Sequence, residues 1–184
     1  NLLLVNKYYY FDSEYAPENL VAIAAEYDNN TGDKVRPEVY EAFKTMADAA
    51  ANEGLALGNN SAYRSYETQQ KLYERYLVTN GKEYAEELSA RAGFSEHQAG
   101  LALDLGVPTG AVVGKFENTA EFAWLEQNAH RFGFILRYPA GKEHLTGYHY
   151  EPWHYRYVGL EVAEYIHEHK LTLEEYYAVF VEGQ

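Results

Sequence analysis

The sequence has no cysteine, no long apolar run and no excess of positive charge, and each absence excludes a class of protein. Without cysteine, the 184-residue chain forms no disulfide and has no thiol nucleophile. No stretch approaches the roughly 20 apolar residues that a membrane-spanning helix needs. The formal net charge is −13, with 15 basic and 28 acidic residues, which argues against nucleic acid as a partner. The acidic residues are dispersed, so no disordered acidic tail is indicated.

The length and the start of the chain set limits of another kind. A chain of 184 residues is long enough for a sizeable core, and we expect a single domain over residues 1–184. Residues 1–16 begin apolar, turn aromatic and lead to Pro17, which predicts an extended N-terminal arm. Because the chain begins at Asn1, with neither an initiator Met nor a signal-like apolar core, we expect a trimmed or processed chain, from which any export signal or anchor is absent.

Hydrophobic periodicity and turn residues predict helices that alternate with short strands. Pro37 suits the first turn of a helix that runs to about Asn52, and Gly54 follows its end. Ser65 or Thr68 can cap the next helix. Further helices are predicted over 82–92, 119–131 and 171–180, and strands over 55–57, 101–105, 133–138, 148–151 and 153–158.

The clearest chemical signal is the stretch Ser-Glu-His-Gln-Ala-Gly-Leu-Ala-Leu-Asp at residues 95–104. Leucines at every second position from 101 to 105 predict a strand with one buried face, so Asp104 points off the opposite face. A loop through Gly100 can fold His97 over that same face. One imidazole nitrogen and one carboxylate oxygen then converge, and this donor pair suits a borderline metal such as zinc.

The stretch Glu-Pro-Trp-His, about fifty residues later, completes the predicted site. A turn at Pro152 can aim Glu151 and His154 into one cavity. His97, Asp104 and His154 then supply three protein ligands and leave one position for water, as in catalytic rather than structural zinc sites. Glu151 lies close to the metal without being needed as a ligand, which makes it the natural general base.

Several alternatives stay open at this level. The spacing alone also allows a hydrogen-bonded loop histidine and a solvated acid in place of a metal site. His144 and His149 are rival ligands, although their spacing to the motif has no structural justification. His167 and His169 could hold a second metal, but such a pair on a polar helix edge is more often solvated. The nineteen tyrosines fit an aromatic-rich core and surface, or a face that stacks on sugars.

The unbroken pattern Ser-x-His-x-x-Gly-x-Ala-x-Asp, followed by Glu-Pro-Trp-His, resembles the VanY-type zinc D-alanyl-D-alanine carboxypeptidases and their L,D-carboxypeptidase relatives. These belong to the fold group of lysostaphin, the D-Ala-D-Ala metallopeptidases and hedgehog. Residues 61–69 are similar to the Tyr-Arg-Ser segment of the family, so the resemblance covers about residues 35–165. It implies an α+β fold in which helices pack on one face of a mainly antiparallel sheet, with the zinc site on the open face.

The resemblance also implies roles for residues outside the metal site. It places Arg64 in the cleft, where the guanidinium would bind a substrate carboxylate or hold the polarised carbonyl oxygen. Gln69 and Ser95 are further candidates for binding the end of the peptide.

The function implied by the resemblance is hydrolysis of the last peptide bond of a peptidoglycan stem peptide, with D-Ala as the leaving group. Zn²⁺ is the expected cofactor, Glu151 the base and Arg64 a stabiliser of the oxyanion. Residues 61–69 look slightly closer to the L,D relatives, so we favour L,D-carboxypeptidase activity on a tetrapeptide over D,D-carboxypeptidase activity on a pentapeptide. The substrate implies a location at the cell surface or outside the cell, and we expect a monomer.

Three other readings are kept at this point. An endopeptidase, as in phage lysins of this fold group, is open because the closure of the cleft cannot be read from the sequence. A hedgehog-like zinc-containing binding module would act through protein contacts, but such a module has no use for the base Glu151. A tyrosine-rich carbohydrate-binding domain with a vestigial metal site is the third reading.

Overall fold

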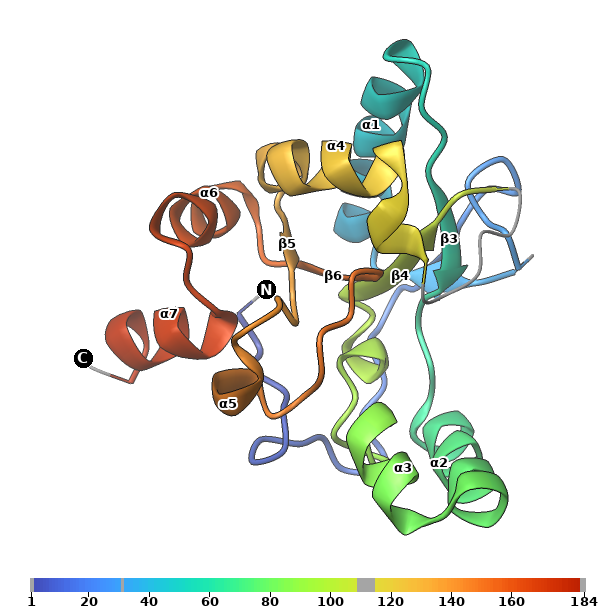
Figure 1. Cartoon of the computed structure of the whole chain (residues 1–184). Helices are drawn as coiled ribbons and strands as arrows, with labels where there is room; N and C mark the ends of the chain where they lie inside the picture. The colour runs from blue at the N-terminus through green and yellow to red at the C-terminus, as the bar shows by residue number, and fades with distance from the viewer. Residues whose placement is uncertain (1, 31, 109–114, 183–184) are drawn as a thin grey trace.

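A computed structural model, which describes residues 2–30, 32–108 and 115–182, contains a four-stranded antiparallel sheet at its centre (Figure 1). The order of its strands is β3-β4-β6-β5. A separate two-stranded sheet pairs β1 with β2. The bounds are β1 (Val21–Ala22), β2 (Lys34–Val35), β3 (Gly58–Ser61), β4 (Ala102–Gly106), β5 (Phe134–Leu136) and β6 (His154–Tyr157).

Helices surround the four-stranded sheet and confirm the predicted α+β fold. In the view of Figure 1, α1 and α4 lie above the sheet, α2 and α3 lie below it, and α6 and α7 lie beyond β5. The α-helices are α1 (Pro37–Asn52), α2 (Tyr66–Asn80), α3 (Lys82–Leu88), α4 (Ala120–Asn128), α5 (Glu143–Thr146), α6 (Leu160–His169) and α7 (Leu173–Phe180). Three short 3₁₀ helices are η1 (Glu96–Ala99), η2 (Phe116–Asn118) and η3 (Ala129–Phe132).

Local capping chemistry fixes the starts of these helices. Proline occupies the first turn of α1, as predicted. The Ser65 hydroxyl accepts a hydrogen bond from the Thr68 amide and caps α2. Thr172 and Glu175 form a reciprocal capping box at α7, which the sequence analysis did not use.

Some predicted element boundaries were wrong. Residues 55–57 are not a strand, because β3 begins at Gly58, and residues 148–151 are not a strand either. The helix expected over 82–92 ends at Leu88, and the helix expected over 119–131 ends as an α-helix at Asn128 and continues as η3.

The main core lies between the sheet and α1 with α4. Leu103, Leu105 and Tyr155 are fully buried there, together with Phe43 and Met46 of α1. Each such side chain contributes roughly 1.5–3 kcal/mol by leaving water. Because side chains alternate along a strand, the residues between these core positions project from the opposite face of the sheet. That alternation supplies the functional face.

The N-terminal arm lies against the loop that carries the motif. Residues 2–20 form neither helix nor strand. The Phe11 amide donates to the carbonyl of Gly93, and the Gln98 side-chain amide donates to the carbonyls of Asp12 and Tyr15. Near the other end of the chain, α6 and α7 pack on a second, smaller apolar cluster of Ile135, Val158, Ala163, Ile166 and Leu173.

Among the described residues, none of the helices combines the length and the apolar character needed to cross a membrane.

Candidate metal centre and active site

The register of β4 against β6 brings two of the predicted ligands together. Asp104 is the direct partner of His154 in this antiparallel pair, and Ser61 is the partner of Asp104 in the neighbouring pair. Directly opposed residues have Cβ atoms about 4.5–5.5 Å apart on the same face of a sheet. If the register of β4 against β6 shifted by one residue, one of these two side chains would point into the core. The alternation of apolar residues in β4 therefore also fixes the positions of Asp104 and His154 in the site.

His97 reaches the same place from the 3₁₀ helix η1. Gly100 ends this helix in the left-handed conformation, with φ 66°, and so directs the chain back into β4. The Nδ1 atom of His97 lies 2.6 Å from the carbonyl oxygen of Ala62. A carbonyl only accepts hydrogen bonds, so Nδ1 carries the proton and Nε2 is the free ring nitrogen. Nε2 is buried without a hydrogen-bond partner and lies 3.3 Å from Asp104 Oδ1.

The donor set fits a zinc ion. His154 Nδ1 lies 3.1 Å from Asp104 Oδ1, and ligand atoms of His97, Asp104 and His154 all lie within 4.8 Å of one another. Two imidazole nitrogens and one carboxylate oxygen are ligands that zinc accepts, and three protein ligands leave a coordination position free. The buried Nε2 atom of His97 finds no other partner that would satisfy it.

Burial and mutual contacts shift the pKa values of the three ligands. Burial raises the pKa of Asp104, but His97 and His154 outweigh burial and hold that pKa well below its usual value. Burial also lowers the pKa of His97. For His154 burial acts in the same direction, but the hydrogen bonds to Asp104 and Glu96 dominate and raise the pKa to about 9. A metal ion must therefore displace a proton from His154, which makes metal affinity dependent on pH.

Glu151 lies beside this group and has an unusual protonation equilibrium. The His154 amide donates to the Glu151 carbonyl across the turn at Pro152, and Glu151 Oε2 lies 3.7 Å from His154 Nδ1. Burial raises the pKa of Glu151 to about 7, and the opposing pull of His154 and Arg64 is too small to cancel it. A carboxyl group with this pKa can both accept and return a proton near neutral pH.

Arg64 enters the site just ahead of α2. Its Nη2 atom lies 3.8 Å from Asp104 Oδ2, and its Nη1 atom donates to Gln69 Oε1 at 2.8 Å. The side-chain amide of Gln69 in turn donates to Ser89 Oγ and to the carbonyl of Ala90. Arg64 Nε is buried without a hydrogen-bond partner. Gln69 therefore fixes one edge of the guanidinium, while Nε stays available for a bound ligand.

All seven predicted site residues line one cavity of about 480 Å³: Arg64, Gln69, Ser95, His97, Asp104, Glu151 and His154. The cavity extends along α2, where Arg75 and Tyr76 line it, and Tyr138, Tyr148 and Trp153 form other parts of its wall. A pocket of this size accommodates a short peptide end.

The rival histidines lie outside this cavity. His144 and His149 are not among its lining residues. The His167 ring stacks on that of His130 with centroids 3.7 Å apart, and the His169 ring stacks on Tyr165 at 4.0 Å. Among the described residues, no second cluster of three metal-ligating side chains accompanies the first.

Comparison with known proteins agrees with this geometry. The family model "VanY: D-alanyl-D-alanine carboxypeptidase" matches residues 32–160. The protein YodJ of Bacillus subtilis is 41% identical over 181 residues, which cover 96% of this chain and 66% of YodJ. The chain belongs to the VanY family.

Solved structures of VanY relatives share the fold. The L,D-carboxypeptidase LdcB superposes with a TM-score of 0.87 at 41% identity, over 95% of this chain and 84% of LdcB. A mutant of the D,D-pentapeptidase VanY in complex with Zn(II) superposes with a TM-score of 0.80 at 34% identity, over 95% of this chain and 97% of that one. The chain spans only 57% of a D-alanyl-D-alanine carboxypeptidase of Enterococcus faecium, to which it is 39% identical.

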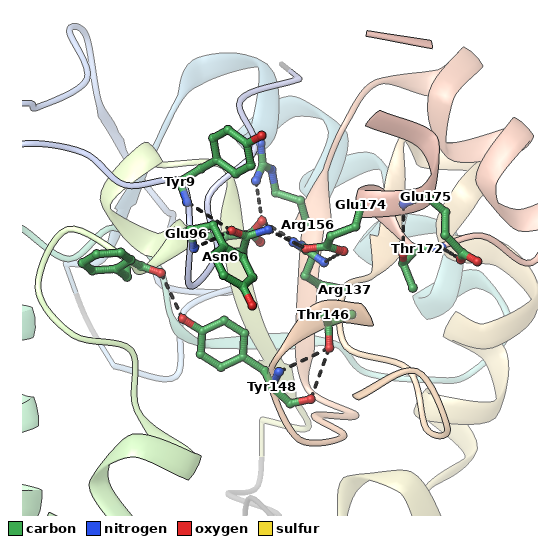
Figure 2. A network of polar contacts seen from close by, with 12 residues as sticks. Asn6, Tyr9, Glu96, Arg137, Thr146, Tyr148, Arg156, Thr172, Glu174 and Glu175 are labelled. Carbon is green, nitrogen blue, oxygen red and sulfur yellow. Dashed lines mark hydrogen bonds and ion pairs between the residues drawn. The ribbon is translucent and has the colours of Figure 1, made fainter. Parts of the chain in front are cut away.

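One buried residue of the cavity wall, Glu96, was not predicted from the sequence. Its Oε2 atom lies 3.3 Å from His154 Nε2. The guanidinium groups of Arg137 and Arg156 both bind Oε1 (Figure 2). Burial raises the pKa of Glu96, but these two arginines outweigh it and hold that pKa well below its usual value. A signal existed in the sequence, because Arg137 and Arg156 each lie within an apolar and aromatic strand segment, where a charge needs a buried partner.

Proposed function

We propose that this chain is a zinc carboxypeptidase that removes the terminal D-Ala from peptidoglycan stem peptides. The observation that carries the proposal is the shared cavity: three metal-ligating atoms, the carboxyl group of Glu151 and the guanidinium of Arg64 face one space. Membership in the VanY family and the Zn(II) complex of a structural neighbour support it. Stem peptides lie outside the cytoplasmic membrane, so the proposal places the protein, as a monomer, at the cell surface or outside the cell.

The side chains divide the chemistry among them. Zinc held by His97, Asp104 and His154 would act as a Lewis acid and make water a better nucleophile at neutral pH. Glu151 accepts a proton from water as the oxygen attacks the carbonyl carbon of the last peptide bond. When the carbon–nitrogen bond breaks, Glu151 returns that proton to the amine of the leaving D-Ala. One water is consumed, and the products are D-Ala and a stem peptide shortened by one residue.

Arg64 acts on the substrate side of the cavity. Its guanidinium offers parallel N–H donors to the terminal carboxylate, or to the oxyanion that develops at the attacked carbonyl. Gln69 holds Nη1 and so orients the group. Ser95 lines the same cavity and is the further candidate for contact with the peptide.

We favour a tetrapeptide substrate, and hence L,D-carboxypeptidase activity, over a pentapeptide. Structures of the L,D-carboxypeptidases LdcB and DacB are 41% and 37% identical to this chain, whereas two VanY structures are 33% and 34% identical. Their TM-scores, 0.87 and 0.77 against 0.83 and 0.80, do not separate the two groups. The D,D activity stays the second candidate because the matching family model is named for D-alanyl-D-alanine carboxypeptidase.

Defined stem peptides test both activities at once. The purified protein is incubated with tri-, tetra- and pentapeptide stems, with and without a chelator, and the products are weighed by mass spectrometry. We expect loss of D-Ala from the tetrapeptide, no such loss after chelation, and recovery when zinc is restored. Cleavage of the pentapeptide alone would replace the L,D assignment with D,D. Cleavage that is insensitive to chelation would refute the metal mechanism.

A binding module that uses the same zinc site makes a different prediction. Such a module would hold stem peptides without shortening them, and the Glu151→Ala variant would bind them as the wild type does. An enzyme instead requires this carboxyl group for turnover, so intact peptide after long incubation with the zinc-loaded wild type would favour the binding module.

A further inference from the structure

Behind the metal ligands, the carboxylate of Glu96 is enclosed by charged side chains (Figure 2). The side chains of Glu96, Arg137 and Arg156 have no exposed surface. Arg137 Nε donates to Glu96 Oε1 at 2.8 Å, and Arg156 Nη1 donates to the same oxygen at 2.6 Å. The other oxygen, Oε2, faces His154 Nε2 at 3.3 Å. The two oxygens of this carboxylate thus serve different partners.

The two arginines are held in turn by segments remote in the sequence. Arg137 donates through both terminal nitrogens to Glu174 of α7, at 2.8 and 2.5 Å. Arg156 Nη2 donates to the carbonyl of Leu3 in the N-terminal arm at 2.6 Å, and the Asn6 amide donates to Glu174 at 3.2 Å. Because a buried charge without a partner is strongly unfavourable, this set of two acids and two bases keeps the Glu96 carboxylate ionised and in place.

We propose that Glu96 is a positioning residue for the metal ligand His154. It accepts a hydrogen bond from the Nε2–H group of His154 and thereby fixes the tautomer whose Nδ1 lone pair faces Asp104 and the metal. A neutral imidazole has one donor and one acceptor nitrogen, and a carboxylate only accepts, so the position of Glu96 decides which nitrogen is which. The inference rests on the proposed zinc site, and Glu96 acts through His154 rather than on the substrate.

The two histidine ligands are thus held differently. The distal nitrogen of His97 meets a neutral carbonyl, that of Ala62, whereas the distal nitrogen of His154 meets a full negative charge. A carboxylate behind a ligating histidine orients the ring and makes it a stronger ligand, and loss of such a partner typically costs 10–100-fold in metal affinity.

The Glu96→Gln variant tests the positioning role of Glu96, because it replaces the hydrogen-bond acceptor beside His154 Nε2 with a donor. The new amide has one oxygen, which the guanidinium groups of Arg137 and Arg156 both require, so its NH₂ group turns toward His154 Nε2. Two donors then face each other unless the proton of the ring moves to Nδ1, on the metal side. We expect the dissociation constant for zinc to rise about 10–100-fold.

Glu174→Gln is the matched control. It removes the same charge from the same network, and Glu174 binds the terminal nitrogens of Arg137 rather than His154. We expect its dissociation constant for zinc to stay within about threefold of the wild-type value. Glu96→Asp keeps the charge but withdraws it by one methylene, and we expect an intermediate affinity. Competition with a chromogenic chelator measures all three variants.

A second measurement needs no variant. Long-range ¹H–¹⁵N correlation spectra of the zinc-loaded wild type, with labelled histidine, report which nitrogen of His154 carries the proton. We expect Nε2, and a proton on Nδ1 would overturn the proposal even if Glu96→Gln fails to fold. Equal zinc affinities for Glu96→Gln and Glu174→Gln would overturn the positioning role alone. A wild-type protein that binds no zinc would overturn the proposed function and this inference with it.

Discussion

Two glutamates lie on opposite sides of His154, and their surroundings give them opposite acidities. Glu151 is 3.7 Å from Nδ1, in the wall of the cavity, and burial raises its pKa to about 7. Glu96 is 3.3 Å from Nε2, on the closed side of the ring. Burial would raise its pKa too, but Arg137 and Arg156 bring it well below the usual value.

The difference shows that partners, rather than burial, decide what a buried acid can do. Glu96 makes charge-assisted hydrogen bonds to two arginines, and its proton is lost at all ordinary pH values. Glu151 has only weaker attractions to His154 and Arg64, so its proton can come and go near neutral pH. Glu96 is therefore suited to hold the metal ligand His154 in position, and Glu151 is suited to transfer protons.

The largest expected effect is on turnover, through Glu151→Gln. The amide keeps the shape of the side chain but cannot take a proton, so we expect kcat to fall by about 10²–10⁴ with little change in zinc affinity. Release of D-Ala from the tetrapeptide stem measures it. Glu38→Gln, on the exposed side of α1, is the control and should keep full activity. Full activity of Glu151→Gln would remove this residue from the mechanism.

The variant Arg137→Ala tests how much the ion pairs around Glu96, beside Nε2 of the His154 ring, stabilise the fold. Removing one partner leaves Glu96 and Glu174 short of a cation in a buried place, so we expect a loss of about 3–5 kcal/mol in the free energy of unfolding. Arg91→Ala breaks the exposed pair with Glu86 and should cost less than about 1 kcal/mol. Urea denaturation compares the two, and equal losses would show that the network stabilises no more than a surface pair.

The two glutamates also predict opposite pH dependences for the metal-free protein. The raised pKa of Glu151 means that the folded state binds more protons than the unfolded state between about pH 4.3 and 7, so stability falls as pH rises through this window. We expect a fall of about 3–4 kcal/mol from this group. The lowered pKa of Glu96 contributes stability that is lost as pH falls below about 4.3.

A separate variant tests each of these two pH dependences of the unfolding free energy. Urea denaturation across pH should show a smaller loss between pH 5 and 7 in Glu151→Gln than in the wild type, and a flatter acid limb in Glu96→Gln. If Glu151→Gln follows the wild-type curve at neutral pH, the raised pKa of Glu151 is refuted.

The smallest expected effect comes from the arm. Asn6 is buried, accepts hydrogen bonds from the amides of Tyr8 and Tyr9, and donates to Glu174. We expect Asn6→Ala to cost about 1–2 kcal/mol of unfolding free energy, because the amides of Tyr8 and Tyr9 lose their part-buried acceptor and Glu174 loses a donor. Asn80→Ala, at the exposed end of α2, should stay within about 0.5 kcal/mol in the same denaturation assay. Equal costs would show that Asn6 does not help to close the network.

Elements whose formation depends on local sequence patterns were predicted correctly. The period-two leucines around Asp104 predicted β4 and its polar face, and Pro37 predicted the start of α1. The strand β3 was not predicted because its residues, Gly-Asn-Asn-Ser, have little strand propensity. The apolar residues just before it have the composition of a strand and were predicted as one. Pairing with β4 and with the loop at Asn29 overrides that propensity.

The positions of the predicted site residues followed from the motif and the family resemblance, but the support behind them did not. The role of Arg64 was predicted from the family resemblance, because the spacing of Arg64 in the sequence does not indicate that its side chain points into the cavity. The ion pairs of Glu96 join residues 41 and 60 positions apart, and pairings at such distances leave no periodic trace in the sequence. The same holds for Glu174, which meets Asn6 across 168 positions.

The arm and α7 meet through that network, and this has a consequence for how the chain matures. Leu3 is synthesised 153 residues before its partner Arg156, and Asn6 is synthesised 168 residues before its partner Glu174. The cage around Glu96 therefore closes only after Glu174 has been synthesised. Until Arg137 and Arg156 have been synthesised, Glu96 lacks the cations that hold it beside the second histidine of the metal site, so the nascent chain should acquire zinc with full affinity only after that point.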